Sequence, residues 1–426
     1  MSLTFDIDDL RLDNGLRLVV HSDHTSPVVA VNVWYGVGSR HEQLSRTGFA
    51  HLFEHLMFQG SRQVPGTDHF ALLQGVGAQL NGTTSFDRTN YYETVPSHAV
   101  ELALWLEADR MGSLLEAINQ ESLDNQRDVV KNERRQRYDN VPYGTAWERI
   151  FAGVFPDGHP YHHMPIGSME HLDAASLEDV HAFFTTWYAP DNAVLSLVGD
   201  ITAARARVLA QTYFGGISAK GGFPSATDGR IAPLEAAIRE EVRDENVPAE
   251  ALYLVFRVPA DGTPECDAVD LALTVLAEGA SSRLTSRLVR NEQVAQFVQG
   301  GVQRLIGGVG IGMLMLRTMP GADLTVVEAA LNEELARFAA EGPTQAELER
   351  AKAQAERGFL DSVSTAEGLA DQLSRCATLF GDPRRVNTAL DAVLGLDRAA
   401  VQAAAASLLT PGNQFVLTYH LQESAA

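Results

Sequence analysis

Residues 49–58 contain two histidines and a glutamate among apolar side chains, and this combination strongly restricts how the chain can fold. In a helix, His51 and His55 lie one turn apart on the same face, and Glu54 projects close to them. The neighbouring side chains are apolar on most sides, which indicates a buried helix. Burying two imidazoles and a carboxylate is costly unless a partner compensates for their lost hydration. The fold must therefore supply such a partner.

A zinc ion would be such a partner, because neutral imidazole nitrogens are common zinc ligands. The run His51-Leu52-Phe53-Glu54-His55 has the order of the inverted zinc-peptidase signature, His-x-x-Glu-His. Two histidines then bind the metal, and the glutamate polarises a water molecule. Histidines and acids at helical spacing also occur on solvated helix faces, but the apolar surroundings favour the metal site. The motif therefore predicts metal-assisted peptide-bond hydrolysis.

A catalytic zinc site of this kind needs a third protein ligand from elsewhere in the chain. Residues 123–138 are expected to be helical and contain several acids, of which Glu133 is the best candidate. Gln126 lies two turns before Glu133 on the same face of this helix. By pattern alone, any one acid of this run is more simply explained by a solvated helix surface. The residues by themselves therefore leave the third ligand open.

The motif and several other segments resemble the pitrilysin/insulinase-type zinc peptidases, a family that includes the mitochondrial processing peptidases. The likeness extends over nearly the whole chain and is strongest before residue 200. The segments that carry it are residues 13–20, 36–42, 48–55, 80–91, 132–133, 190–193, 197–201 and 281–284.

The resemblance implies one zinc ion per chain with three protein ligands, His51, His55 and Glu133. It implies that Glu54 is the general base that activates water. Family members often carry a second acid where this chain has Gln126. We therefore expect Gln126 to lie beside the ligands as an uncharged hydrogen-bonding neighbour and to change the zinc affinity.

A strand is expected over residues 79–85, with small polar side chains and an accessible backbone. The resemblance implies that an extended peptide pairs with its edge and contacts Leu80, Asn81, Gly82 and Thr83. The alternative is an ordinary edge strand whose small residues discourage aggregation.

The apolar pattern predicts an α+β fold with two homologous domains, each an antiparallel-rich mixed sheet with helices on one face. Residues 1–218 are expected to form the zinc-binding domain, and residues 235–426 a similar domain without the motif. Residues 219–234 are rich in Gly, Pro, Ser and Asp and are expected to link them. Both halves end alike, with a helix followed by Pro190-Asp191-Asn192 in the first and Pro411-Gly412-Asn413 in the second.

Individual strands and helices are expected at defined positions along the chain. Strands are predicted at residues 16–21, 28–35, 193–198, 251–257 and 312–317. Helices are predicted at residues 67–76, 97–111, 176–187, 266–277, 281–290, 324–340, 345–360, 365–378 and 397–408.

The charge and the first residues of the sequence restrict the expected binding partners and the expected cellular location. The net charge of −22 on 426 residues disfavours nucleic acid and anionic membrane surfaces as partners. The first residues contain no basic region and no apolar run, so we expect no secretory signal and a cytoplasmic location. Two widely separated cysteines do not make a disulfide framework.

The resemblance also implies that this chain is one half of a clamshell, because full-size members enclose their substrate between two halves of this size. In active assemblies an Arg and a Tyr from a second domain pair or partner subunit hold the substrate carbonyl. Arg290 matches the arginine, whereas Phe297 stands at the tyrosine position. We therefore expect a dimer with a related subunit that lacks the zinc motif and supplies the Arg/Tyr pair. A homodimer is the alternative.

The expected function is that of a zinc-dependent endopeptidase that hydrolyses peptides or unfolded segments inside a chamber formed with a second subunit. The alternative is a non-catalytic homologue that acts as an assembly or peptide-binding subunit. The complete set of His51, Glu54, His55 and Glu133 favours the enzyme, because a scaffold has no need to keep these residues.

Overall fold

The computed structural model describes residues 3–421, which form two compact units. The first unit consists of the described residues up to Glu133 together with His163–Thr227 and Phe359–Ala389. The second consists of Arg134–His162, Asp228–Gly358 and the described residues from Leu390 onward. Two units were expected, but they are interleaved in the sequence, in contrast to the contiguous domains 1–218 and 235–426. The outermost residues of those expected domains, 1–2 and 422–426, lie outside the described part.

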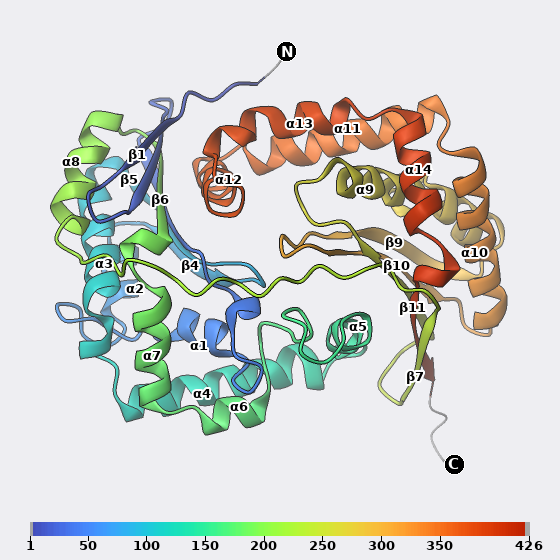
Figure 1. Cartoon of the computed structure of the whole chain (residues 1–426), viewed down its shortest axis with the longest axis horizontal. Coiled ribbons are helices and arrows are strands. Elements are labelled where there is room, and N and C mark those ends of the chain that lie inside the picture. The colour runs from blue at the N-terminus through green and yellow to red at the C-terminus, as the bar shows by residue number, and fades with distance from the viewer. Residues whose placement is uncertain (1–2, 422–426) are drawn as a thin grey trace. The chain divides into compact units, whose positions relative to one another are not determined.

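The first unit is built on a six-stranded mixed sheet, of which β1, β4, β5 and β6 are labelled in Figure 1. The strand order is β1-β2-β6-β3-β5-β4. Strands β2 and β6 run parallel, and all other neighbours are antiparallel. The strands are β1 (Asp8–Arg11), β2 (Arg17–Ser22), β3 (Val28–Tyr35), β4 (Gln79–Thr84), β5 (Thr89–Pro96) and β6 (Ala193–Gly199). Strand β4 lies at one edge of this sheet.

The first unit also contains helices and short helical turns, several of which pack on the sheet. Its α-helices are α1 (Phe49–Leu56), α2 (Asp68–Gly75), α3 (Val100–Ser113), α4 (Gln120–Arg134), α6 (Met169–Ala174), α7 (Leu177–Trp187), α8 (Ala203–Phe214), α12 (Ala366–Leu379) and the start of α13 (Val386–Leu394). Its 3-10 turns are η1 (Ser39–His41), η2 (Ser97–Ala99), η3 (Leu114–Glu116), η5 (Pro190–Asn192) and η7 (Pro383–Arg385).

The second unit is built on a five-stranded mixed sheet with the order β7-β11-β8-β10-β9. This order repeats β2-β6-β3-β5-β4 of the first unit, and β7 and β11 are again the parallel pair. The strands are β7 (Ile238–Asp244), β8 (Ala251–Val258), β9 (Ala295–Gln303), β10 (Gly310–Thr318) and β11 (Phe415–Leu421). The prediction of an α+β fold with two similar mixed sheets is therefore confirmed.

Helices of both α and π type belong to the second unit. The α-helices are α5 (Ala146–Val154), α9 (Pro264–Ala277), α10 (Leu324–Glu341), most of α11 (Gln345–Ser362) and α14 (Arg398–Leu408). The π-helices are η4 (Arg135–Asp139) and η6 (Thr285–Asn291), and η8 (Pro411–Asn413) is a 3-10 turn. The predicted helix over residues 281–290 thus has π geometry along most of its length, which is rare and often found at functional sites.

The similar endings of the two halves have the same local structure. In each, a 3-10 turn that begins at a proline leads into the last strand of the sheet. The side-chain amide of Asn192 donates to the carbonyl of Trp187 at 2.8 Å, and that of Asn413 donates to the carbonyl of Leu408 at 2.8 Å. The same turn therefore closes the helix before the last strand in both units.

One helix from the opposite half of the sequence covers the second face of each sheet, where helices were expected on one face only. Helix α12 packs on β3 and β6 of the first unit, and Ser374 Oγ donates to Ser196 Oγ at 2.7 Å. Helix α5 packs on β8 and β11 of the second unit, where the Arg257 side chain donates to the Val154 carbonyl at 2.8 Å. This exchange is the physical reason that the units are interleaved.

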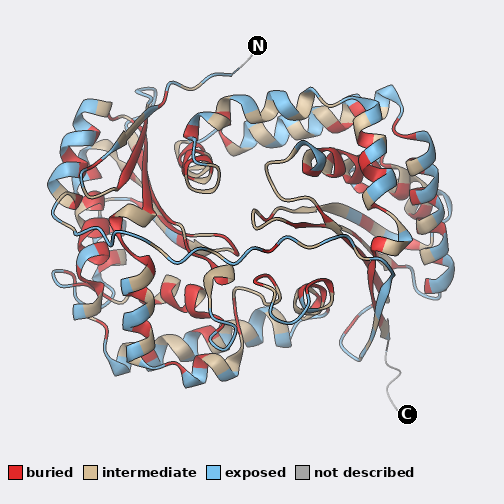
Figure 2. Cartoon of the chain, in the orientation of Figure 1, coloured by how far each residue is buried: buried red, intermediate tan, exposed pale blue. Residues whose placement is uncertain are grey.

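Strands β3 and β6 are buried along almost their whole length, because helices lie on both faces (Figure 2). Such strands read as continuous apolar runs, which is why the sequence predicted both of them correctly. Within residues 3–421, none of the helices is both long enough and apolar enough to cross a lipid bilayer.

Candidate metal centre

Helix α1 carries His51, Glu54 and His55. Its buried face consists of Phe49, Ala50, Leu52, Phe53 and Leu56, so the helix forms where the apolar pattern predicted it. The helix begins after Gly48, whose φ of +93° lies in the left-handed region that favours glycine.

The structure brings the three predicted ligands together. Nε2 of His51 lies 3.5 Å from Oε2 of Glu133, and Nε2 of His55 lies 3.3 Å from the same oxygen. The two imidazole rings are 4.9 Å apart between centroids. Among residues 3–421, these three form the one group of His, Cys, Asp or Glu side chains whose geometry could hold a metal ion.

This arrangement fits zinc. Ligand atoms around a tetrahedral zinc with bonds of 2.0–2.1 Å are separated by about 3.3 Å. The distances of 3.3 and 3.5 Å from Glu133 match that spacing. Two imidazole nitrogens and one carboxylate oxygen are a donor set that catalytic zinc sites use. The side chains are 12%, 21% and 16% exposed for His51, His55 and Glu133, so the site is shielded and still reachable from solvent.

Glu54 is not a member of the ligand group and points toward strand β4. A Cβ atom added at Gly82 would lie 3.1 Å from Cγ of Glu54, so the helix and the strand are in close contact there. Burial raises the pKa of the Glu54 carboxyl, and the negative charge of Glu133 adds to the rise. A hydrogen bond from Thr84 and the charge of His55 oppose that shift. A carboxyl with a raised pKa beside a metal site suits proton transfer.

Contacts with the segment around α6 hold helix α4 in place. The guanidinium of Arg127 donates to the carbonyls of Leu172 at 2.8 Å and Ala175 at 2.7 Å. Lys131 forms an ion pair with Asp173 at 2.7 Å. These contacts hold one face of α4, and so fix the direction in which Glu133 projects from the helix.

Gln126 is half-buried and lies two turns before Glu133 on α4, as the spacing predicted. Its influence on zinc affinity stays a prediction.

Strand β4, with Leu80, Asn81, Gly82 and Thr83, pairs with β5 and ends the sheet, so its outer edge has no neighbouring strand among the described residues. The Gly82 amide donates to Oδ1 of Asn81 at 2.9 Å. Arg88 donates to the Thr83 carbonyl at 2.9 Å and to Asn90 Oδ1 at 3.0 Å, which fixes the end of the strand. The predicted edge strand is therefore present beside Glu54.

Arg290 lies in the second unit, on η6, with an exposed side chain that donates to Ser286 Oγ at 2.6 Å. Phe297 lies on β9, and the guanidinium of Arg317 is 5.0 Å from its ring centroid. Both residues belong to the second unit, whereas the metal ligands belong to the first.

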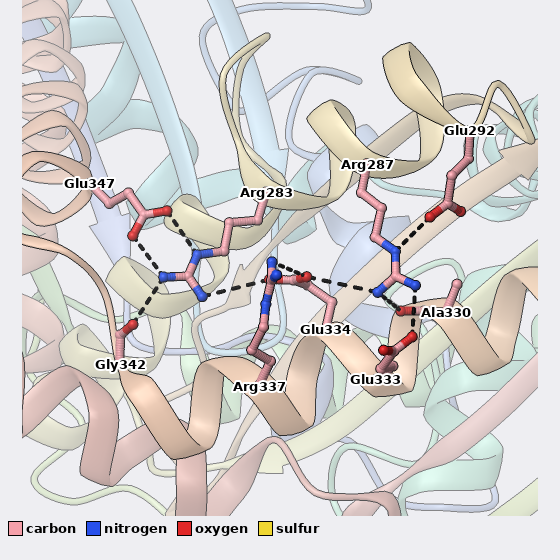
Figure 3. A network of polar contacts seen from close by, with 9 residues as sticks. All are labelled: Arg283, Arg287, Glu292, Ala330, Glu333, Glu334, Arg337, Gly342 and Glu347. Carbon is pink, nitrogen blue, oxygen red and sulfur yellow. Dashed lines mark hydrogen bonds and ion pairs between the residues drawn. The ribbon is translucent and has the colours of Figure 1, made fainter.

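A network of ion pairs anchors η6 and the residues just before it to α10 and α11 (Figure 3). Arg283 pairs with Glu347 at 2.8 Å and donates to the Gly342 carbonyl at 3.0 Å. Arg287 pairs with Glu333 at 2.7 Å. The fully buried carboxylate of Glu334 lies between Arg283 and Arg287, at 3.6 and 3.9 Å, and also pairs with Arg337.

Glu42 accepts hydrogen bonds from the start of α1, and His163 contacts Glu42; neither residue had a predicted role. The carboxylate of Glu42 accepts from the Gly48 amide at 2.9 Å and the Ala50 amide at 2.7 Å. His163 Nε2 lies 2.9 Å from Glu42 Oε2. Glu42 belongs to residues 36–42, which carry part of the resemblance, but its sequence pattern gives no sign that it would reach a helix beginning several residues later.

Comparison with known proteins places the chain in a family. Residues 17–146 match the family described as insulinase (peptidase family M16), and residues 174–355 match the family described as peptidase M16 inactive domain. These matches cover more than half of the sequence, and the chain belongs to peptidase family M16. The resemblance drawn from the sequence is thereby confirmed.

Similar proteins include bacterial proteases. The zinc protease PqqE of Helicobacter pylori is 28% identical over 366 residues, which cover 85% of this chain and 81% of that protein. The crystal structure of a protease from Helicobacter pylori has a TM-score of 0.91 at 25% identity and covers 98% of this chain and 100% of its own. The periplasmic protease PqqL from Escherichia coli has the same fold, with a TM-score of 0.77 at 17% identity, and this whole chain covers 48% of it.

Proposed function

We propose that this chain is the metal-carrying subunit of a zinc-dependent endopeptidase that hydrolyses peptides or unfolded segments. The observation that carries the proposal is the convergence of His51, His55 and Glu133, which come from two helices. His51 and His55 would hold the zinc through Nε2 and Glu133 through a carboxylate oxygen. Zinc bound there would act as a Lewis acid toward the scissile carbonyl and would lower the pKa of water.

Glu54 is the proposed general base. Its carboxylate would take a proton from the attacking water as the new C–O bond forms. The same proton would then pass to the amine nitrogen as the C–N bond breaks. No covalent bond between enzyme and substrate is needed. Thr84, which hydrogen-bonds to Glu54, would keep the carboxylate directed toward the substrate side of α1.

Strand β4 is the proposed site for the substrate backbone. An extended peptide could add to its open edge as one more antiparallel strand. The contact of Asn81 with the Gly82 amide would then be exchanged for a contact with the peptide. Gly82 lies directly beside Glu54, so a peptide on this edge would pass next to the base. Leu80 and Thr83 flank this position.

A second subunit is part of the proposal. This chain covers 48% of PqqL, so it has the size of half of a larger protease of the same fold. Phe297 has no hydroxyl to donate to a substrate carbonyl. A related subunit that lacks the zinc motif would supply an arginine and a tyrosine to complete the site, and a homodimer would be less active.

The alternative is a non-catalytic homologue that serves as an assembly or peptide-binding subunit. The match to the inactive domain begins at residue 174, after all of the candidate ligands, so it concerns the half without the motif. The intact set of ligands and base supports the enzyme over this alternative.

The test uses the tagged chain, purified from its native host so that any partner is retained. Peptide-library cleavage is measured with zinc, with a chelator, and after zinc is restored. Glu54→Gln should keep the zinc and lose cleavage by about 10²- to 10⁴-fold. The matched control Glu121→Gln changes an exposed glutamate on α4 and should leave cleavage unchanged. Chelator-resistant cleavage, or full cleavage by Glu54→Gln, would contradict the proposal.

A further inference from the structure

Helix α1 has no cap from its own first residues. Gly48 stands at its N-cap position and has no side chain to accept a hydrogen bond. The first amides of a helix have no partner within the helix, so an uncapped start is prone to fray. This matters more for α1 than for most helices, because it has only 8 residues and carries His51, Glu54 and His55.

Glu42 supplies the missing cap from outside the helix. One carboxylate oxygen, Oε2, accepts from the Gly48 amide at 2.9 Å, and the other, Oε1, accepts from the Ala50 amide at 2.7 Å. The side chain is 0% exposed, so water does not compete for these bonds. A carboxylate at this end of a helix also interacts favourably with the helix dipole.

His163 and the residues after it hold Glu42 and the helix start together. His163 Nε2 lies 2.9 Å from Glu42 Oε2, and the imidazole is 13% exposed. A Cβ atom at Gly167 would lie 2.3 Å from both N and Cα of Gly48, so the backbones meet with no space for a side chain. The Ser168 amide donates to Oγ1 of Thr47 at 3.0 Å.

We propose that Glu42, held by His163, is a positioning residue for the metal helix: it fixes the first turn of α1 so that His51 and His55 face Glu133. Glu42 does not itself touch the ligand atoms. The inference rests on the proposed function only in assuming that zinc is the ion bound. Loss of the Glu42 contacts should first lower the zinc affinity and the stability of α1. It should also lower kcat with little change in KM.

The test compares Glu42→Ala with a matched loss of a cap elsewhere. Asp397 caps α14 in the other unit by accepting from the Ala400 amide at 2.8 Å, and Asp397→Ala removes that contact. Zinc affinity is measured by competition with a chromophoric chelator, and helix opening by hydrogen exchange of the amides of α1. Glu42→Ala should weaken zinc binding by about 10- to 100-fold and speed exchange in α1, whereas Asp397→Ala should do neither.

Two milder variants keep the test informative if Glu42→Ala does not fold. Glu42→Gln keeps one acceptor oxygen and should show a smaller loss of zinc affinity in the same direction, and His163→Gln should do likewise. Equal zinc affinity and equal exchange in α1 for Glu42→Gln, His163→Gln and the wild type would overturn the inference. A wild type that binds zinc tightly without cleaving peptides would contradict the proposed function instead, and would leave the positioning role standing.

Discussion

Oε2 of Glu133 lies 3.3 Å from Nε2 of His55, although the two residues belong to different helices that are far apart in the sequence. Helix α1 contributes the histidines through a local motif, and helix α4 contributes the carboxylate through its packing against the region of α6. The candidate centre therefore depends on tertiary structure for one of its three ligands.

Removing this carboxylate should release the metal. Glu133→Gln keeps the size of the side chain but replaces the charged oxygen donor with an amide. Changes to groups that merely support a ligand cost 10- to 100-fold in affinity, so the loss here should exceed about 100-fold. Zinc content after dialysis and chelator competition measure the effect. Glu121→Gln on the same helix is the control, and equal zinc binding by both variants would remove Glu133 from the site.

Restoring the missing hydroxyl should increase the activity of the chain on its own. Phe297→Tyr adds a donor at a half-buried position on β9, where the ring already lies against Arg317. Loss of one such donor costs about 10²- to 10³-fold in turnover. We expect kcat of the purified chain to rise by at least about tenfold, while Phe297→Leu has no such effect. An unchanged kcat for Phe297→Tyr would show that the position does not serve as the tyrosine of the pair.

The buried pair Glu93 and Glu107 should make stability depend on pH. Burial raises the pKa of Glu93 well above 4.5, and the charge of Glu107, which forms a salt bridge with Arg110, adds to the rise. The folded protein therefore keeps a proton that the unfolded chain releases near pH 4.5. The stabilisation from this group is complete below that pH and decreases as the pH rises toward the folded pKa, by up to about 1.4 kcal/mol per pH unit.

Glu93→Gln tests this dependence. The amide can still donate to Glu107 and cannot ionise. The free energy of unfolding, measured by urea titration from pH 5 to pH 8, should fall less steeply for the variant, which should be the more stable protein at pH 8. Parallel profiles for the two proteins would contradict a proton held on Glu93.

The network in Figure 3 should stabilise the second unit through Glu334. Its carboxylate is 0% exposed and lies among three guanidinium groups. Glu334→Gln should lower the free energy of unfolding by about 2–3 kcal/mol, because a buried charge network loses its anion. The neighbouring Glu333 is 72% exposed, so Glu333→Gln should cost less than about 1 kcal/mol. Equal urea midpoints for the two variants would contradict a central role for Glu334.

The sequence correctly predicted the elements that can be identified from their local residue pattern alone. The range 28–35 is that of β3, and Ser176 caps α7 as the first residue of the predicted helix over 176–187. The metal motif was found for the same reason, since its spacing is local.

Elements whose stability comes from distant partners could not be predicted from the sequence. Strand β5 contains the buried polar residue Asn90, which is compatible with a strand here because other segments accept its hydrogen bonds. Asn90 meets Asp371 of α12 at 3.4 Å, a contact across most of the sequence. The placement of α12 on the first sheet depends on distant residues in the same way. Glu42 lies close to α1 in the sequence, but His163, which contacts it, lies 121 positions away. A local pattern does not show which remote side chain will complete it.

The most direct test of the account is the location of zinc in a crystal of the purified chain. Diffraction data collected on both sides of the zinc absorption edge would locate the metal without reference to its ligands. We predict one anomalous peak per chain, bonded to Nε2 of His51, Nε2 of His55 and a carboxylate oxygen of Glu133. A zinc-replete crystal with no peak there, and with Glu133 turned away from the two rings, would contradict it.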